Sequence, residues 1–235
     1  MVEFKNVSLT YSNGSNALNN IDLKIEKGEF VFLVGPNGSG KSSILKLIYR
    51  EILPSSGDVI VDNEDVVFTK KSNIPYFRRK LGIVFQDFRL LPYKTIYENI
   101  AYALEVIGKD QAEIKEHVNA VLKLVSLEDK KKRFPNELSS GEQQRISIAR
   151  ALVNDPMLFL ADEPTGNLDP KTSIEIIKLL EKINEQGTTM LVTTHDMEIV
   201  NELQKRVVII NDGNIIKDEA KSGYHIPSVF FNKIK

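Results

Sequence analysis

Gly35-Pro36-Asn37-Gly38-Ser39-Gly40-Lys41-Ser42 is the stretch that decides the fold of this 235-residue chain. It matches the pattern G-x-x-x-x-G-K-[ST]. The wholly apolar run Phe30 to Val34 precedes it, as expected of a strand buried on both faces, and residues 42–50 after it carry apolar side chains at helical spacing. A buried strand, a glycine-rich loop and an amphipathic helix in this order predict a phosphate-binding loop, or P-loop.

The residue types of this loop suit phosphate. Glycines allow backbone N–H groups to turn inward around phosphate oxygens, and the N-terminus of the following helix adds partial positive charge. Lys41 is expected to reach the β- and γ-phosphates of a nucleotide as a catalytic cation, and the Ser42 hydroxyl to bind Mg²⁺. The residues predicted to bind nucleotide here are Gly35, Pro36, Asn37, Gly38, Ser39, Gly40, Lys41, Ser42 and Ser43.

An acidic strand end downstream completes such a site. The apolar run Met157 to Ala161 predicts a second buried strand, and it ends at Asp162 and Glu163. Asp162 is expected to hold Mg²⁺, directly or through water. Glu163 is placed to polarise the attacking water as general base.

The rest of the chain alternates strand and helix patterns, which predicts an α/β fold with a mainly parallel sheet. Residues 2–11 and 21–25 read as strands of an N-terminal antiparallel β subdomain, and helical patterns dominate from Lys94 to Asp155. Further strands are expected at 59–61, 82–85 and 189–193, a helix at 174–183, and a hairpin at 207–216 that turns at Gly213. We expect a single nucleotide-binding domain over 1–235, with a core of 1–87 and 157–220, a helical lobe of 88–156 and a tail of 221–235.

Composition excludes several classes of protein. Hydrophobic residues make up 42% and charged residues 27%, the formal net charge is −1, and the chain has no cysteine. Disulfide frameworks and thiolate sites are therefore excluded, and no broad basic field is available for nucleic acid. No apolar run approaches the roughly 20 residues of a membrane-spanning helix, so we expect a cytoplasmic protein that meets a membrane through a partner.

A third motif connects the chain to a known family. Leu138-Ser139-Ser140-Gly141-Glu142-Gln143-Gln144-Arg145 resembles the signature motif of ATP-binding cassette (ABC) ATPases, although Ser140 stands where glycine is usual. Together with the P-loop, the Asp162-Glu163 strand end, Asn167-Leu168-Asp169 and His195, the resemblance covers residues 1 to about 220. It implies a P-loop NTPase fold of the ABC type that hydrolyses ATP with Mg²⁺.

The resemblance also implies roles for single residues. Tyr11 matches the aromatic side chain that stacks on adenine, with an ordinary strand aromatic as the structural alternative. Gln86 matches the glutamine that senses Mg²⁺ and the membrane partner, and His195 matches the histidine that contacts the γ-phosphate. Without the family, His195 is more often a structural residue. Gln86 and His195 are thus expected to join Lys41 and Glu163 in catalysis.

In this family the signature motif faces the nucleotide of the opposite subunit. Ser139, Gly141 and Glu142 are therefore expected to bind ATP in trans, and Asp169 to line the interface of a head-to-tail homodimer. Each chain then carries two half-sites, and two chains complete two ATP sites.

Glu163 to Asp169 resembles a part of the family that contains FtsE together with the lipoprotein-release and macrolide-exporter ATPases. Within it, Phe85 to Pro92 and Thr95 to Ala101 look most like the FtsE branch. That branch implies an integral membrane partner of the FtsX type, docked near Gln86 to Pro92 at the cytoplasmic face of the plasma membrane. It also implies a role in bacterial cell division and peptidoglycan hydrolysis. A lipoprotein-release or macrolide-type exporter is the alternative. A soluble nucleic-acid-associated ABC ATPase is disfavoured, because the chain has neither a coiled-coil insertion nor a second cassette.

Two segments carry apolar or basic residues without a motif. The tail 221–235 mixes aromatic and aliphatic residues with lysines, which is compatible with a membrane or partner anchor. We favour a tail that packs on its own domain or frays. Lys130 to Arg133 is a short basic run, and such runs are usually solvated loops.

Overall fold

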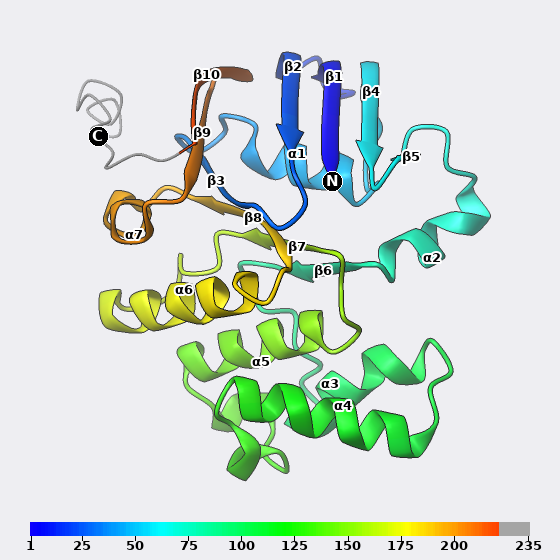
Figure 1. The fold of residues 1–235 in the computed structure, drawn as a ribbon, viewed down its shortest axis with the longest axis vertical. Coiled ribbons are helices and arrows are strands. Elements are labelled where there is room, and N and C mark those ends of the chain that lie inside the picture. Colours follow the sequence, from blue (N-terminus) through cyan, green and yellow to red (C-terminus); the bar gives the residue numbers. More distant parts are fainter. Residues whose placement is uncertain (221–235) are drawn as a thin grey trace.

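The P-loop lies at the carboxyl end of β3 (Phe30–Val34), inside a mainly parallel sheet (Figure 1). This computed structural model describes residues 1–220. β3 pairs in parallel with strands on both of its sides, and antiparallel pairing occurs at the β10 edge. In spatial order the sheet is β10 (Asn214–Glu219), β9 (Arg206–Asn211), β3, β8 (Thr189–Thr194), β7 (Leu158–Asp162) and β6 (Leu81–Val84).

The N-terminal strands form a second, antiparallel sheet, as predicted. Its spatial order is β2 (Asn16–Ile25), β1 (Val2–Thr10), β4 (Ser56–Val61) and β5 (Glu64–Asp65). β2 begins at Asn16, earlier than the predicted Ile21, because Thr10 pairs with Asn16 and Leu9 with Leu18 across a long twisted hairpin.

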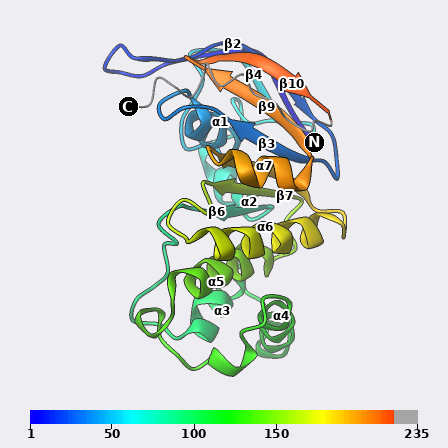
Figure 2. The ribbon, with the colours of Figure 1, turned by 90° about the vertical axis from the view of Figure 1, so that its left-hand side faces the viewer.

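Helices lie between the sheets and below the parallel one. Figure 2 shows α6 under this sheet, α5 below α6, and α3 and α4 lower still. The helices are α1 (Lys41–Ile48), α2 (Ile74–Arg78), α3 (Ile96–Glu105), α4 (Gln111–Leu124), α5 (Ser140–Leu152), α6 (Pro170–Asn184) and α7 (Met197–Leu203). Short 3₁₀ turns occur at Lys71–Asn73, Glu128–Lys130 and Pro135–Glu137.

Alternation along β3 divides the core into two layers. Val31 and Leu33 pack with α1 and the antiparallel sheet, whereas Phe30, Phe32 and Val34 pack toward α5, α6 and α7. A separate apolar cluster joins α3, α4 and α5. All five β3 residues are buried, which confirms that this strand is covered on both faces.

Most predicted elements are present, and the differences have local causes. α6 begins at Pro170, four residues before the predicted start, because the Asp169 carboxylate caps its first turn. The short helices α2 and α7 were not predicted, since a segment of five or seven residues has too few turns to show helical periodicity. The predictions for the tail 221–235 fall outside the described residues. Within residues 1–220, no helix is long and apolar enough to cross a membrane.

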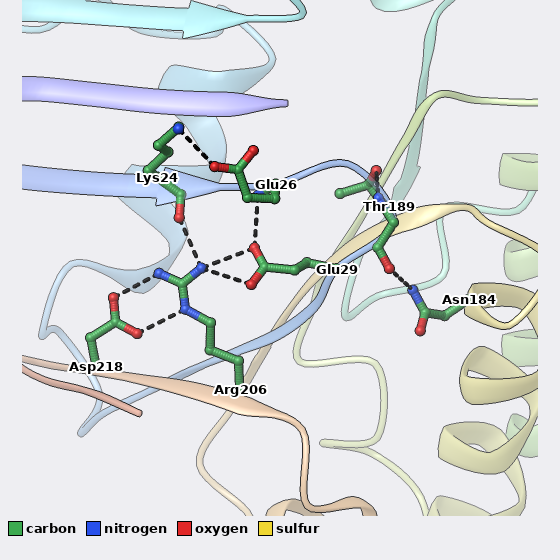
Figure 3. Close-up of polar contacts among 8 residues, drawn as sticks. Lys24, Glu26, Glu29, Asn184, Thr189, Arg206 and Asp218 are labelled. Carbon is green, nitrogen blue, oxygen red and sulfur yellow. Dashed lines mark hydrogen bonds and ion pairs between the residues drawn. The ribbon is translucent and has the colours of Figure 1, made fainter. Parts of the chain in front are cut away.

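One arginine joins both sheets (Figure 3). Arg206, at the start of β9, donates two hydrogen bonds to Asp218 on β10, at 2.8 and 2.7 Å. Its Nη1 donates to both carboxylate oxygens of Glu29, at 3.1 and 2.9 Å, and to the Lys24 carbonyl at 2.9 Å. Hydrogen bonding to Asp218, followed by the charges of Asp218 and Glu29, raises the pKa of the guanidinium despite its burial. The planar fork of arginine allows a bidentate contact with Asp218 through Nε and Nη2 while Nη1 remains available for Glu29 and the Lys24 carbonyl.

Replacing Arg206 tests how much this contact stabilises the fold. Arg206→Met leaves two carboxylates facing each other, and we expect a loss of about 2 kcal/mol in the free energy of unfolding. This is below the 3–5 kcal/mol typical of fully buried pairs, because Glu29 and Asp218 are partly exposed. Urea unfolding measures the change. Lys205→Met is the control, since Lys205 forms a single ion pair with Glu181. Equal effects of both variants would contradict the prediction.

Candidate nucleotide-binding site

A cleft of about 440 Å³ opens between the P-loop and the carboxyl ends of β6 and β7. Parallel strands place their carboxyl ends at one edge, so residues far apart in the sequence meet there. The predicted residues Tyr11, Gln86, Asp162 and Glu163 all line this cleft. The P-loop and α1 contribute Asn37, Gly38, Gly40, Lys41, Ser42 and Ser43, and the β2 end contributes Ser15, Asn16 and Ala17.

Lys41 is buried inside the loop that it follows. Its Nζ donates to the carbonyls of Gly35 at 2.8 Å and Pro36 at 3.1 Å, and lies 3.6 Å from Glu163 Oε1. The side chain is only 5% exposed, so these oxygens replace the water that an ammonium group needs. The positive charge is therefore fixed at the centre of the P-loop, beside the acidic end of β7.

Ser42 and Asp162 meet across the cleft. The Ser42 hydroxyl donates to Asp162 Oδ1 at 3.1 Å, and the Thr193 hydroxyl of β8 donates to the same oxygen at 2.8 Å. A hydroxyl and a carboxylate are the hard oxygen ligands that Mg²⁺ prefers, so this pair fits the predicted ion. Sequence analysis gave Thr193 no role, because its contact depends on the pairing of β7 with β8.

Glu163 lies between two cationic or potentially cationic groups. Its Oε1 faces Lys41, and its Oε2 is 3.2 Å from His195 Nδ1. The backbone at Glu163 is left-handed, with φ of 46°, and its N–H donates to Thr193 Oγ1 at 2.9 Å. A left-handed conformation is uncommon for a non-glycine residue and directs this side chain away from the strand axis. The structure thus brings Glu163 and His195 together, as predicted.

The segment after Gln86 is clamped from the helical side. The Gln86 carbonyl accepts from Asn167 Nδ2 at 3.1 Å. Phe88 and Arg89 both have positive φ, and Arg150 of α5 donates to their carbonyls at 2.8 and 2.6 Å. Burial lowers the pKa of the Arg150 guanidinium. Asn167 belongs to the predicted family motif Asn167-Leu168-Asp169, but its contact with Gln86 was not expected. Arg150 was not predicted, because nothing local distinguishes it from an ordinary polar helix residue.

Tyr11 follows β1 and reaches the first turn of α1. Its hydroxyl lies 2.9 Å from Ser43 Oγ. The ring therefore lies at the margin of the cleft on the P-loop side, which is a suitable place for a stacking contact with a base.

The signature residues lie at the start of α5 and do not line this cleft. Ser139 caps the helix by accepting from the Glu142 N–H at 3.3 Å. The Glu142 carboxylate turns back onto Ser139 and pairs with Lys130. The contact with Lys130, followed by the Ser139 N–H, lowers the pKa of Glu142. This carboxylate is occupied by its own chain, so the geometry favours a role in holding Ser139 over the predicted direct contact with nucleotide.

Asp169 and the signature motif share one surface. A Cβ on Gly141 would lie 2.4 Å from Thr172 Cγ2, and the Thr172 N–H donates to Asp169 Oδ1 at 3.1 Å. The hydrogen bond from the Thr172 hydroxyl, followed by the one from the Thr172 N–H, keeps the pKa of Asp169 below its ordinary value. The starts of α5 and α6 are therefore packed side by side, and Gly141 is the residue that permits the approach.

Comparison with known proteins agrees with this geometry. The ABC transporter family model matches residues 18–166. A curated relative named cell division ATP-binding protein FtsE, from Bacillus subtilis, is 53% identical over 95% of this chain and 98% of its own length. The chain belongs to the ABC transporter family, in its FtsE group. The protein of that name from Mycobacterium tuberculosis is 50% identical, with the same coverage of both chains.

Solved structures of ABC cassettes have the same fold as this chain. The ATP-binding cassette MJ0796, in a dimeric post-hydrolysis state with ADP and phosphate, aligns with a TM-score of 0.86 and 39% identity. That alignment covers 95% of this chain and all of the other. The cassette cbiO1 from Clostridium perfringens gives 0.87 and 30%, over 99% of this chain and 90% of its own. The P-loop NTPase fold of the ABC type is confirmed, and the chain is an ATP-binding and ATP-hydrolysing subunit.

Lys41→Ala tests the phosphate end of the cleft. Removing the ammonium leaves the loop carbonyls and Glu163 without their cation, and we expect ATP affinity to fall at least tenfold. Isothermal titration calorimetry measures the dissociation constant. Lys46→Ala on the same helix is the control, because Lys46 is partly exposed, lies outside the cleft and pairs with Glu51. Unchanged affinity in Lys41→Ala would refute the placement.

Proposed function

We propose that two copies of this chain, arranged head to tail, hydrolyse ATP with Mg²⁺ and thereby drive an integral membrane partner in bacterial cell division. The complex would lie at the cytoplasmic face of the plasma membrane. The observation that carries the proposal is the convergence of Lys41, Ser42, Asp162 and Glu163 on a single cleft at the edge of the parallel sheet, with His195 next to Glu163 in the adjoining pocket.

Binding of ATP begins at the P-loop. Lys41 exchanges part of its contact with loop carbonyls for the β- and γ-phosphate oxygens, while the N-terminus of α1 adds its partial charge. Ser42 and Asp162 would hold Mg²⁺, which, when bound, neutralises charge that develops on the phosphate oxygens. Tyr11 stacks on the adenine.

Hydrolysis then requires a water placed in line with the γ-phosphate. Glu163 accepts a proton from this water as the oxygen attacks phosphorus, and the bond to the ADP oxygen breaks. His195 lies beside Glu163, where it would orient the base and contact the γ-phosphate once ATP is bound. Gln86 lines the same cleft and completes the Mg²⁺ and water environment.

The dimer follows from the position of the signature residues. Ser139 and Gly141 lie at a helix N-terminus that is suited to an anion but lies away from the cleft of their own chain. A second copy, reversed, would present them to the γ-phosphate, with Asp169 at the interface. The dimeric MJ0796 structures support this arrangement.

The membrane partner would dock beside the loop that follows Gln86. This loop runs to a groove in which Pro92, Tyr93 and Phe134 supply the apolar surface and Tyr93 is 93% exposed. The other residues that line the groove are polar or charged: Lys132, Arg133, Asn136 and Glu137. Arg150 ties the same loop to α5, whose first turn carries the signature motif. Movement of the docked partner would therefore be transmitted to the cleft through Gln86 and to the signature motif through Arg150 and α5. The FtsE name of the relatives supports a partner of the FtsX type.

Glu163→Gln separates binding from hydrolysis. An amide cannot accept the proton, so we expect ATP to bind with unchanged affinity while turnover falls at least a hundredfold. The uncleaved nucleotide should trap a dimer, visible by size-exclusion chromatography with ATP. Glu198→Gln on α7 is the control, because Glu198 lies outside the cleft. Normal turnover by Glu163→Gln in a purified assay would remove the general-base role.

Depletion of the protein in its native host tests the cellular role. We expect filaments or failed septa, and an FtsX-type membrane protein that copurifies with the chain. Tyr93→Ser should capture less of this partner than Tyr76→Ser, whose exposed tyrosine lies outside the groove. Normal division, with lipoproteins stranded in the membrane and a release permease recovered, would assign the chain to an exporter instead.

A further inference from the structure

The turn between β9 and β10 lies against the back of the P-loop. The Gly213 N–H donates to the Ser39 carbonyl at 3.0 Å. On its other side the Gly213 carbonyl accepts from the Asn19 N–H at 2.8 Å, and Asn19 Nδ2 donates to the Asp212 carbonyl at 3.2 Å. The turn is thus held between the P-loop and β2, although it comes near the end of the described chain.

Glycines make this approach possible. A Cβ on Gly213, where φ is +75°, would lie 2.8 Å from the Ala17 carbonyl oxygen. A Cβ on Gly40 would lie 2.7 Å from the same oxygen, and one on Gly35 would lie 2.1 Å from the Ile210 carbonyl oxygen. Contacts this short cannot form without a backbone shift. Backbone therefore packs on backbone where the P-loop, β2 and the β9–β10 turn meet.

The hydrogen bond to Ser39 sets the direction of a phosphate-binding amide. In a planar trans peptide the C=O of Ser39 and the N–H of Gly40 point in opposite directions. Gly213 holds the Ser39 carbonyl on the side away from the cleft, because Gly40 lines the cleft and Gly213 does not. The Gly40 N–H is thereby aimed toward the cleft, where a phosphate oxygen needs a donor.

The far end of the hairpin is also fixed. Arg206 binds Glu29, just before β3, and Asp218 on β10 (Figure 3). From there β9 runs in parallel register with β3, with Val31 opposite Arg206 and Val34 opposite Ile209. Both strands begin next to the Arg206 contacts. β3 leads to the P-loop, which contains Ser39, and β9 leads to the turn, which contains Gly213. The hairpin therefore has a defined position relative to the P-loop.

We infer that the β9–β10 turn, through Gly213, is a positioning element of the nucleotide site that orients the P-loop amide of Gly40 for phosphate. The inference rests on the proposed role of the P-loop in binding ATP phosphates. Gly213 does not touch nucleotide; it acts through the peptide between Ser39 and Gly40.

Gly213→Ala tests the inference. The added Cβ must displace the turn from Ala17 and lengthen its bond to Ser39, so we expect ATP affinity to fall at least tenfold. In the ATPase assay KM should rise by a similar factor, while kcat changes less than threefold, because Glu163 and His195 are not moved. Hydrogen exchange should become faster across residues 36–41 in the absence of nucleotide.

Gly108→Ala is the matched control. Gly108 has nearly the same φ, +80°, but a Cβ there meets no atom within 4 Å. Gly108→Ala therefore places an alanine at positive φ but displaces no neighbouring atom. This variant should bind ATP with the affinity of the wild type. Asn19→Ala is the milder variant for the case that Gly213→Ala fails to fold. It removes the bond to Asp212 and should weaken ATP binding about threefold.

Wild-type protein and Lys41→Ala are measured in parallel. Failure of the wild type to bind ATP would overturn the proposed function itself. In another outcome the wild type binds ATP and Lys41→Ala loses this binding, while folded Gly213→Ala keeps the wild-type affinity and KM. That combination would overturn the inference about Gly213 but leave the proposed function in place. Unchanged affinity in Asn19→Ala would do the same if Gly213→Ala does not fold.

Discussion

A backbone that wraps around phosphate must point its amides inward, and the carbonyls that then point outward need donors behind them. Here the Ser39 carbonyl receives the Gly213 N–H from behind the loop, whereas the carbonyls of Gly35 and Pro36 accept from the Lys41 ammonium at the centre of the loop. Side chains have no room at these contacts. The position of the P-loop thus depends on a strand before it, a helix after it and a hairpin from the far end of the described chain.

The same edge of the sheet holds the acidic groups close to a buried cation. Asp162 is fixed by hydroxyl groups of Ser42 and Thr193, and Glu163 by Lys41 and His195. Each carboxylate therefore has its own partners, and the two can serve different purposes although they are neighbours. In the proposed mechanism Asp162 would hold Mg²⁺ and Glu163 would accept the proton of the attacking water. Thr193 contacts both residues and maintains the spacing between them.

Local patterns predicted the parts of this arrangement that depend on neighbours in sequence. The P-loop, the buried strand β3 and the acidic end of β7 are continuous segments with distinctive composition, and the structure contains them as expected. Arg150 and Thr193 act through contacts with distant segments, so their sequence context is unremarkable, and Gly213 was predicted as a hairpin turn but not as a partner of the P-loop. For Glu142 the family motif predicts a direct contact with nucleotide. In the structure of the single chain its carboxylate instead accepts from the Ser139 N–H in the capping box of α5.

In the proposed dimer each ATP site is built from two chains, and a mixing experiment with two variants tests this arrangement. Lys41→Ala and Ser139→Arg are each placed in the Glu163→Gln background, and dimer formation with ATP is followed by analytical ultracentrifugation. In a head-to-tail heterodimer one interface carries both defects and the other carries neither. Each variant alone should stay monomeric, and the mixture should form an ATP-dependent dimer. A mixture that remains monomeric, or a Ser139→Arg variant that dimerises alone, would contradict the composite site.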